Sequence, residues 1–300
     1  MTTSYAPAIR RWYSAHARDL PWRHPDATPW SILVSEVMLQ QTPVSRVLPA
    51  HMAWLQRWPD PASLAAASAA DAVRQWDRLG YPRRAVRLHT SAALITTTYA
   101  GEVPASVDQL RTLPGVGAYT AAAVSSFAFG QRHAVLDTNV RRVLARLVTG
   151  AARPAIAPTA AERQLAERLL PSDGRQAAQW SVGVMELGAL ICTAARPRCD
   201  QCPLAARCAW RRLGQPAAPA RRAAPGYHGS DRHCRGQLLA VLRAASGPVS
   251  ADILWAAWHE AEQRSRALAG LIDDGLVSRR ADGSFALPGD AGKAATLAAR

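Results

Sequence analysis

The sequence predicts an all-α protein that ends in a small, mainly helical module. Before residue 230, apolar residues recur at helical spacing, and no run alternates apolar and polar residues as a half-buried strand would. Residues 211–230 are rich in Pro, Ala, Gly and Arg without periodicity, which is typical of a linker. Helical stretches and a short hairpin pattern follow it. We therefore expect two domains, residues 1–210 and 231–300, joined by this linker.

Helix start signals position the first predicted helices. Thr28 and Pro29 are residue types preferred at an N-cap and at the first helical position, so a helix is expected over residues 30–40. Thr42 and Pro43 repeat this signal at the start of the next helix. Further helical patterns cover residues 63–79, 82–99, 106–112, 118–129, 138–148, 158–170 and 175–190.

The C-terminal module shows the order of elements that is typical of a winged helix. Helices are expected near residues 232–244, 250–257 and 260–274, and Gly275 is placed to end the last of them. Residues 276–277 and 285–287, separated by a turn at Asp282-Gly283, predict a hairpin. The third helix is either a DNA-recognition helix, through Arg264 and Arg266, or the face that packs the module onto the other domain.

The charge indicates a polyanionic partner. The chain has 36 Lys and Arg against 22 Asp and Glu, a formal net charge of +14, and its only lysine is Lys293. Nucleic acid is the natural partner of such a chain, and charge kept for solubility is the alternative. No apolar run approaches the roughly 18–20 residues that span a membrane, and residues 1–11 lack a signal-peptide core. We expect a cytoplasmic, nucleoid-associated protein with no membrane partner.

Four of the five cysteines form a cluster that predicts a metal site. Cys192, Cys199, Cys202 and Cys208 are separated by six, two and five residues, and Cys234 stands apart. An intracellular chain seldom uses such a cluster for disulfides. Four thiolates in a compact loop can hold a tetrahedral zinc ion or a 4Fe–4S cluster, and the spacing alone leaves both open.

A glycine-rich turn, Leu113-Pro114-Gly115-Val116-Gly117, joins two predicted helices. Its glycines permit a tight backbone turn with outward N–H groups, and the following helix adds the positive end of its dipole. Such a turn can bind a DNA phosphate without reading the base sequence.

Two carboxylates are candidates for catalysis. Asp137 precedes a predicted helix, so it is either a helix cap or a catalytic carboxylate. Glu36 shares a helical stripe with Ile32 and Leu39, which would half-bury it and raise its pKa, as a general acid requires. A solvated Glu36 at the edge of the stripe is the alternative.

Five segments together resemble the MutY family of adenine DNA glycosylases: LPWR at 20–23, SEVMLQQT at 35–42, LGY at 79–81, LPGVGAYTAAAV at 113–124 and VLDTNVRRVLAR at 135–146. The resemblance covers roughly residues 10–210. It implies a two-lobed helical core of the helix-hairpin-helix glycosylases. It also implies a 4Fe–4S cluster held by the four cysteines in the loop 192–208. The winged-helix-like module would then be an appendage to this core.

The resemblance also implies a reaction and its residues. A monomeric base excision repair enzyme would flip adenine out of double-stranded DNA where it is mispaired with guanine or 8-oxoguanine. Glu36 would protonate the adenine at N7, and Asp137 would stabilise the sugar cation, supported by Tyr119 and Asn139. Residues implied in binding the base or the DNA are Trp22, Arg23, Gln40, Gln41, Tyr81, Leu113, Gly115, Val116 and Gly117.

Tyr119 separates this prediction from its alternatives. Bifunctional relatives place a lysine there, whose amine forms a Schiff base, so Tyr119 predicts a monofunctional enzyme. The alternatives are an endonuclease III-like pyrimidine glycosylase with lyase activity, and a non-catalytic zinc protein that binds DNA. Val182 departs from the family, which commonly has Gln or Glu at this position, facing the flipped base.

Overall fold

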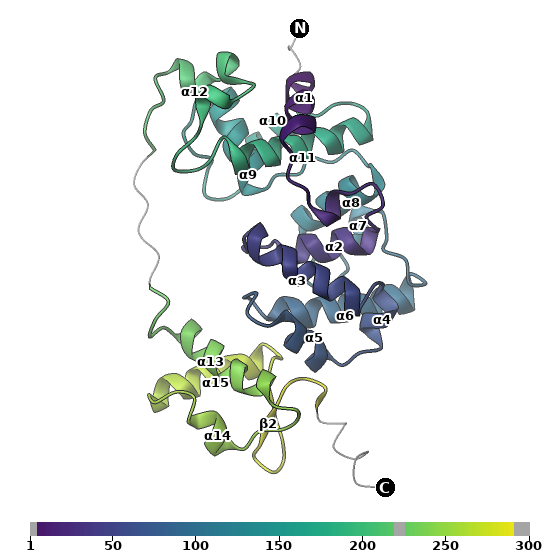
Figure 1. The fold of residues 1–300 in the computed structure, drawn as a ribbon, viewed down its shortest axis with the longest axis vertical. Coiled ribbons are helices and arrows are strands. Elements are labelled where there is room, and N and C mark those ends of the chain that lie inside the picture. Colours follow the sequence, from purple (N-terminus) through teal and green to yellow (C-terminus); the bar gives the residue numbers. More distant parts are fainter. Residues whose placement is uncertain (1–4, 219–225, 291–300) are drawn as a thin grey trace. The chain divides into compact units, whose positions relative to one another are not determined.

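The computed structural model describes residues 5–218 and 226–290, so Lys293 and residues 219–225 of the predicted linker lie outside the described residues. The described chain is mostly helical, and its strands lie beyond residue 277 (Figure 1). It divides into two compact units, residues 1–32, 105–111 and 116–222 in unit 1 and residues 33–104, 112–115 and 223–300 in unit 2. Within residues 5–218 and 226–290, no helix has both the length and the apolar character needed to cross a membrane.

Unit 1 is built from the beginning of the chain and from segments after residue 104. It holds α1 Ala6–His16, the 3₁₀ turn η1 Pro21–Arg23, the first turn of α2 Pro29–Met38, α7 Val107–Leu110, α8 Ala118–Phe129, α9 Thr138–Leu144, the π-helical turn η2 Ala145–Thr149, α10 Ala160–Leu169, α11 Gly174–Leu190, the 3₁₀ turns η3 Cys199–Gln201 and η4 Ala205–Arg207, and α12 Ala209–Arg212.

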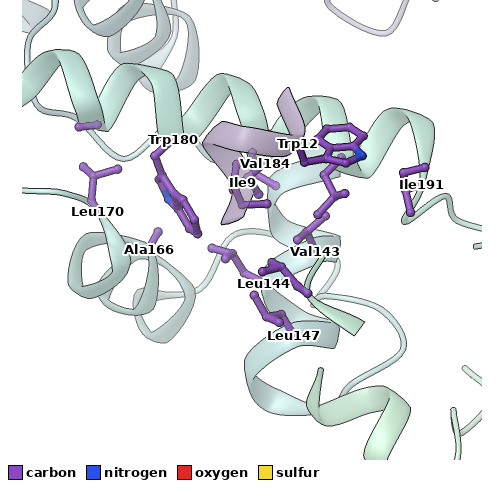
Figure 2. Close-up of a cluster of buried hydrophobic side chains, with 14 residues drawn as sticks. Ile9, Trp12, Val143, Leu144, Leu147, Ala166, Leu170, Trp180, Val184 and Ile191 are labelled. Atoms are coloured by element: carbon purple, nitrogen blue, oxygen red, sulfur yellow. The ribbon is translucent and has the colours of Figure 1, made fainter. Parts of the chain in front are cut away.

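The core of unit 1 lies where α1, α9 and α11 meet (Figure 2). Ile9 and Trp12 of α1 pack with Trp180 and Val184 of α11 in this cluster, and Leu144 of α9 joins them. Two glycines of α11 allow this close approach. A Cβ at Gly183 would lie 2.5 Å from Ile9 Cγ2, and one at Gly188 would lie 2.7 Å from Asn139 Cβ. The contact at Gly188 brings α11 against the start of α9.

Unit 2 combines the middle of the chain with the C-terminal module. Its first elements are the rest of α2, α3 Val44–Arg57, α4 Pro61–Ala65, α5 Ala69–Trp76 and α6 Arg83–Thr98. Both α4 and α5 contact α6. Trp54 of α3 is fully buried and meets Trp58 and Trp76 edge-on, at 4.7 and 5.6 Å between ring centroids. These large rings fix the spacing between α3 and α5.

The module has the predicted order of three helices and a hairpin. It comprises α13 Asp231–Ala244, α14 Ala251–Trp255, α15 Ala261–Asp273, β1 Ser278–Arg279 and β2 Phe285–Ala286. The strands pair antiparallel, with Ser278 opposite Ala286, and Val249 bridges to Phe285 on the other side. Helix α13 contacts α5, and Arg74 of α5 forms an ion pair with Asp290 at 2.6 Å.

Several features of the elements confirm the sequence prediction, and three differences stand out: a helix cap, a divided helix and a strand limit. Helix α2 begins at Pro29, and the Ser31 N–H donates to the Thr28 hydroxyl at 3.1 Å, as expected of a cap. Thr42, however, does not cap α3. Its hydroxyl accepts from Arg84 at 2.9 Å, and Pro43 occupies the cap position instead. The prediction there was wrong because a distant arginine competes for the hydroxyl.

The other two differences arise from local chemistry. The stretch 63–79 forms two helices because Ser68 and Asp71 make a reciprocal capping box that starts α5 at Ala69. The first strand lies at 278–279 rather than 276–277, since Leu276 and Val277 are buried directly after the Gly275 stop. Helix α1 was not among the predicted helices.

Candidate functional site

Asp137 is the N-cap of α9, and both of its carboxylate oxygens are held. The Val140 N–H donates to Oδ1 at 2.6 Å, and the Asn139 side-chain amide donates to Oδ2 at 2.8 Å. Burial raises the pKa of Asp137, while these two hydrogen bonds and the charge of Arg142 oppose that rise. The structure therefore confirms the cap, and it also fixes a partly buried carboxylate in one orientation.

Arg142 fixes the orientation of Asn139. Its Nη2 donates to Asn139 Oδ1 at 2.7 Å, so the amide NH₂ of Asn139 must face Asp137. The same guanidinium donates to the carbonyl oxygens of Gly188 and Cys192, both at 2.7 Å. Asp137 thus belongs to a hydrogen-bonded chain that ends at the first cysteine of the loop. Sequence reasoning did not assign Arg142 a role, although the segment that contains it was recognised.

Glu36 lies on α2 and is buried more deeply than its predicted half-buried position. It is 5% exposed, and the helix is buried from Trp30 to Met38 rather than along one stripe. Burial of a carboxylate favours its protonated form. Glu36 belongs to unit 2, and Asp137 belongs to unit 1.

Gln41 and Tyr81 lie together at the surface of unit 2. The Tyr81 hydroxyl donates to Gln41 Oε1 at 3.0 Å, and both side chains are exposed. Both residues have left-handed backbones, with φ of 58° at Gln41 and 49° at Tyr81. The neighbouring Gln40 instead donates to the Gly115 carbonyl at 3.4 Å. All of these residues are predicted site residues, but their strained backbone could not be predicted from the sequence.

The glycine-rich turn adopts the backbone that its sequence predicts. Gly115 has φ of +85°, and Gly117 is the N-cap of α8. Leu113 and Val116 are buried, so a DNA contact at these two positions would come from the backbone alone. Tyr119 lies half-buried in the first turn of α8.

Arg23, next to the buried Trp22, is positioned by a buried carboxylate that the sequence analysis did not single out. Trp22 is buried, and Arg23 Nη1 donates to Glu186 Oε2 at 2.9 Å. Arg18 pairs with the same carboxylate through its Nε and Nη2, at 2.7 and 2.8 Å. Burial alone would raise the pKa of Glu186, but the hydrogen bonds from Arg18 and the charge of Arg23 lower it to about 2. Glu186 is therefore an ionised anchor for the two arginines.

The four clustered cysteines are free thiols at the edge of the unit 1 core. Three of them, Cys192, Cys202 and Cys208, pack against that core. Burial raises the pKa of Cys202 to about 11, so its thiol is neutral unless a metal displaces the proton. Cys234 is buried in α13, away from the loop in sequence and in the other unit.

The surroundings of these thiols suit an iron–sulfur cluster. Arg146 donates to Cys192 Sγ at 3.4 Å, and Gln215 donates to Cys199 Sγ at 3.2 Å. N–H donors to sulfur and partial burial are the means by which proteins hold and tune such clusters. Within the described ranges, no group of three or more His, Cys, Asp and Glu side chains is placed to hold a metal ion. The donor set of four thiols nevertheless matches what a 4Fe–4S cluster requires.

Comparison with known proteins gives one family and one fold. The HhH-GPD superfamily of base excision DNA repair proteins matches residues 34–171. An adenine DNA glycosylase of Mycobacterium tuberculosis is 51% identical over 282 residues, which cover 93% of this chain and 92% of that protein. A thermostable thymine-DNA glycosylase superposes with a TM-score of 0.63 at 28% identity, over 70% of this chain and 95% of the other.

A trapped endonuclease III–DNA covalent intermediate superposes with a TM-score of 0.58 at 24% identity, over 69% of this chain and 95% of the other. Identity at this level shows the fold alone. The two solved structures thus confirm the predicted all-α glycosylase fold over about 70% of the chain.

Proposed function

The chain belongs to the family of adenine DNA glycosylases, and on that premise we propose that it excises adenine mispaired with guanine or 8-oxoguanine in double-stranded DNA. The proposal depends most on the two carboxylates, Glu36 and Asp137, which stand in the segments that resemble this family. We further propose that it acts as a monomer, in the cytoplasm at the nucleoid. We also retain the division into a glycosylase domain, a linker and a C-terminal module as a proposal.

The two carboxylates divide the chemistry of N-glycosidic cleavage. Adenine is a poor leaving group until N7 is protonated, and Glu36, being buried, is the group proposed to supply that proton. Cleavage then leaves positive charge on the sugar. Asp137, whose two side-chain oxygens are held by Val140 and Asn139, is proposed to stabilise that cation as a carboxylate until water attacks. A fixed carboxylate does not need to reorient as the charge develops.

Other residues are proposed to bind and orient the substrate. Gln41 and Tyr81 would wedge into the base stack, while the N–H groups of Gly115 and Gly117 would bind phosphate. Trp22 and Arg23 would frame the adenine, with Arg23 oriented by Glu186. Gln40 would support the glycine-rich turn from the side of α2.

The cysteine loop is proposed to hold a 4Fe–4S cluster through Cys192, Cys199, Cys202 and Cys208. When bound, such a cluster supplies a redox-active iron–sulfur centre and ties the loop together. Arg146 and Gln215 would donate hydrogen bonds to its thiolates. Brown protein with visible absorption and about four irons per chain would support this, whereas colourless zinc protein would contradict it.

The reaction is tested with duplexes that pair adenine with 8-oxoguanine, guanine or cytosine. We expect free adenine from the first two, and strand breaks only after alkali, because Tyr119 replaces the lysine of the bifunctional enzymes. A borohydride-trapped covalent adduct, or excision of pyrimidines instead of adenine, would support the endonuclease III-like alternative. Mispair binding without release of any base would support the non-catalytic alternative.

A further inference from the structure

Arg84, in the first turn of α6, is a buried cation whose hydrogen bonds, in the part of the chain that the structure describes, all go to uncharged oxygen atoms. It is 6% exposed, and within the described ranges it forms no ion pair with a carboxylate. Burial lowers the pKa of Arg84 to about 10, so it remains protonated at neutral pH. A buried charge without a counter-ion is costly unless fixed dipoles replace the lost water. The surrounding oxygen atoms therefore compensate this charge.

These oxygen atoms belong to two segments that Arg84 joins. The acceptors, at 2.6 to 3.4 Å, are the carbonyl oxygens of Val37, Met38, Gln40, Gly80 and Tyr81 and the hydroxyl of Thr42. The first three carbonyls lie at the C-terminal end of α2, where carbonyls lack partners within the helix. Gly80 and Tyr81 lie in the turn before α6. One planar guanidinium thus connects the end of α2 with that turn.

The exposed pair Gln41–Tyr81 lies at the junction of these segments. Arg84 contacts the residues on both sides of Gln41, and it contacts the Tyr81 carbonyl directly. Its guanidinium carbon also lies 5.4 Å from the centre of the Tyr81 ring. A left-handed backbone at a residue other than glycine is strained and persists only where its surroundings impose it. Gln41 and Tyr81 both have such a backbone.

We propose that Arg84 is a positioning residue that holds Gln41 and Tyr81 as a preformed wedge before DNA binds. The inference rests on the proposed function, because a wedge has a role only where a base is extruded from the stack. A wedge that is already ordered spares the encounter complex the free-energy cost of ordering two exposed side chains and their strained backbone. A preformed wedge is therefore expected to speed the extrusion of the base, because this ordering cost is not part of the barrier.

The test uses Arg84→Lys, which keeps the charge but lacks the planar fork. Extrusion is followed by the fluorescence of 2-aminopurine beside an adenine:8-oxoguanine mispair, and excision is followed separately in single turnover. We expect Arg84→Lys to slow extrusion by about 10- to 100-fold, as misplacement of a positioning group does. In a protein that already carries Gln41→Ala and Tyr81→Ala, the same change is expected to slow extrusion by less than about twofold.

Arg141→Lys is the matched control, because Arg141 is equally buried at 7% but pairs with Glu162 in unit 1. It is expected to lower the melting temperature without slowing extrusion. If Arg84→Lys does not fold, Thr42→Val removes one of the acceptors and is expected to slow extrusion in the same direction by a smaller factor.

Two results would overturn the inference: extrusion at the parental rate in the folded Arg84→Lys variant, or equal slowing with and without the wedge side chains. A parent protein that does not extrude the base would overturn it as well. If the parent extrudes adenine without excising it, the proposed function fails, while the role of Arg84 is judged by the extrusion rates alone.

Discussion

Asp137 uses both carboxylate oxygens for hydrogen bonds at the start of α9. The same oxygen atoms therefore serve both the stability of the helix and the proposed chemistry. A substitution that tests the chemistry must keep the helix cap while it removes the negative charge. Asparagine comes closest, because its amide oxygen can keep the cap bond from Val140, although its NH₂ group cannot accept from Asn139 and it carries no charge.

We expect Asp137→Asn to reduce adenine excision by about 10²–10³-fold or more, because a neutral amide cannot balance the sugar cation. Mispair affinity should stay close to that of the parent, and the melting temperature should fall slightly, because the bond from Asn139 is lost. Single-turnover excision and equilibrium binding to the same duplex measure the two properties. Excision near the parental rate would leave Asp137 as a helix cap only.

The buried carboxylate of Glu186 is expected to stabilise the folded protein in a pH-dependent way. Its pKa falls from 4.5 to about 2 on folding, so the stability it contributes is fully present above about pH 4.5 and is lost as the pH falls through about 2. Glu186→Gln should lower the free energy of unfolding at pH 7 by about 3 kcal/mol, because Arg18 and Arg23 lose their counter-ion. The difference from the parent should shrink between pH 4.5 and 2. A difference that does not change with pH would contradict this pairing.

Among the secondary-structure elements, α11 shows why close packing is hard to predict from sequence. Helical periodicity predicted residues 175–190, and α11 covers Gly174–Leu190. Periodicity could not show that Gly188 faces Asn139, because that contact depends on how α9 lies against α11. The same limit applies to Thr42, whose hydroxyl is taken by Arg84 from a later helix. By contrast, the capping box that divides 63–79 is formed by Ser68 and Asp71, which are close in the sequence. The prediction of one helix there did not use this signal.

The close approach at Gly188 is tested by Gly188→Ala. The added Cβ would lie 2.7 Å from Asn139 Cβ and 3.0 Å from its carbonyl oxygen, so Asn139 must move. We expect a loss of about 1–3 kcal/mol in stability and a reduced excision rate, since Asn139 orients Asp137. Gly183→Ala is the control on the same helix, because its added Cβ meets Ile9 instead. It should cost similar stability while keeping the excision rate of the folded protein. Equal loss of excision in both variants would show that α11 acts only through stability.

The metal ligands of the cysteine loop stay a prediction that rests on the spacing of the four cysteines and on the family resemblance. Cys199→Ser should lower the iron content and the visible absorption. Cys234→Ser should change neither, because Cys234 is buried in α13. Iron analysis and the absorption spectrum of the purified proteins measure this. Unchanged iron in Cys199→Ser would remove that residue from the ligand set.

Across the whole molecule, the positive charge is unevenly distributed. Residues 226–290 contain seven arginines against eight acidic residues, whereas the full chain has a net charge of +14. In α15, Arg264 donates to the carbonyl oxygens of Trp255 and Trp258, and Arg266 pairs with Asp231. The two arginines expected of a recognition helix are therefore engaged within the module. The alternative, a module packed on the rest of the chain, agrees with the contacts between α13 and α5.

Deleting residues 226–300 distinguishes these roles of the module. We expect the slope of log affinity against log salt for mispaired DNA to change by less than about one unit, because nearly all of the excess positive charge lies before residue 226. The melting temperature should fall, because Arg74 loses Asp290 and the Ala245 carbonyl, and Asp77 loses Arg243. Arg74→Met in the full chain should reproduce part of that fall without altering the slope. A folded, truncated protein with a much shallower slope, or with less discrimination between 8-oxoguanine and guanine than the parent, would mean that the module contacts DNA.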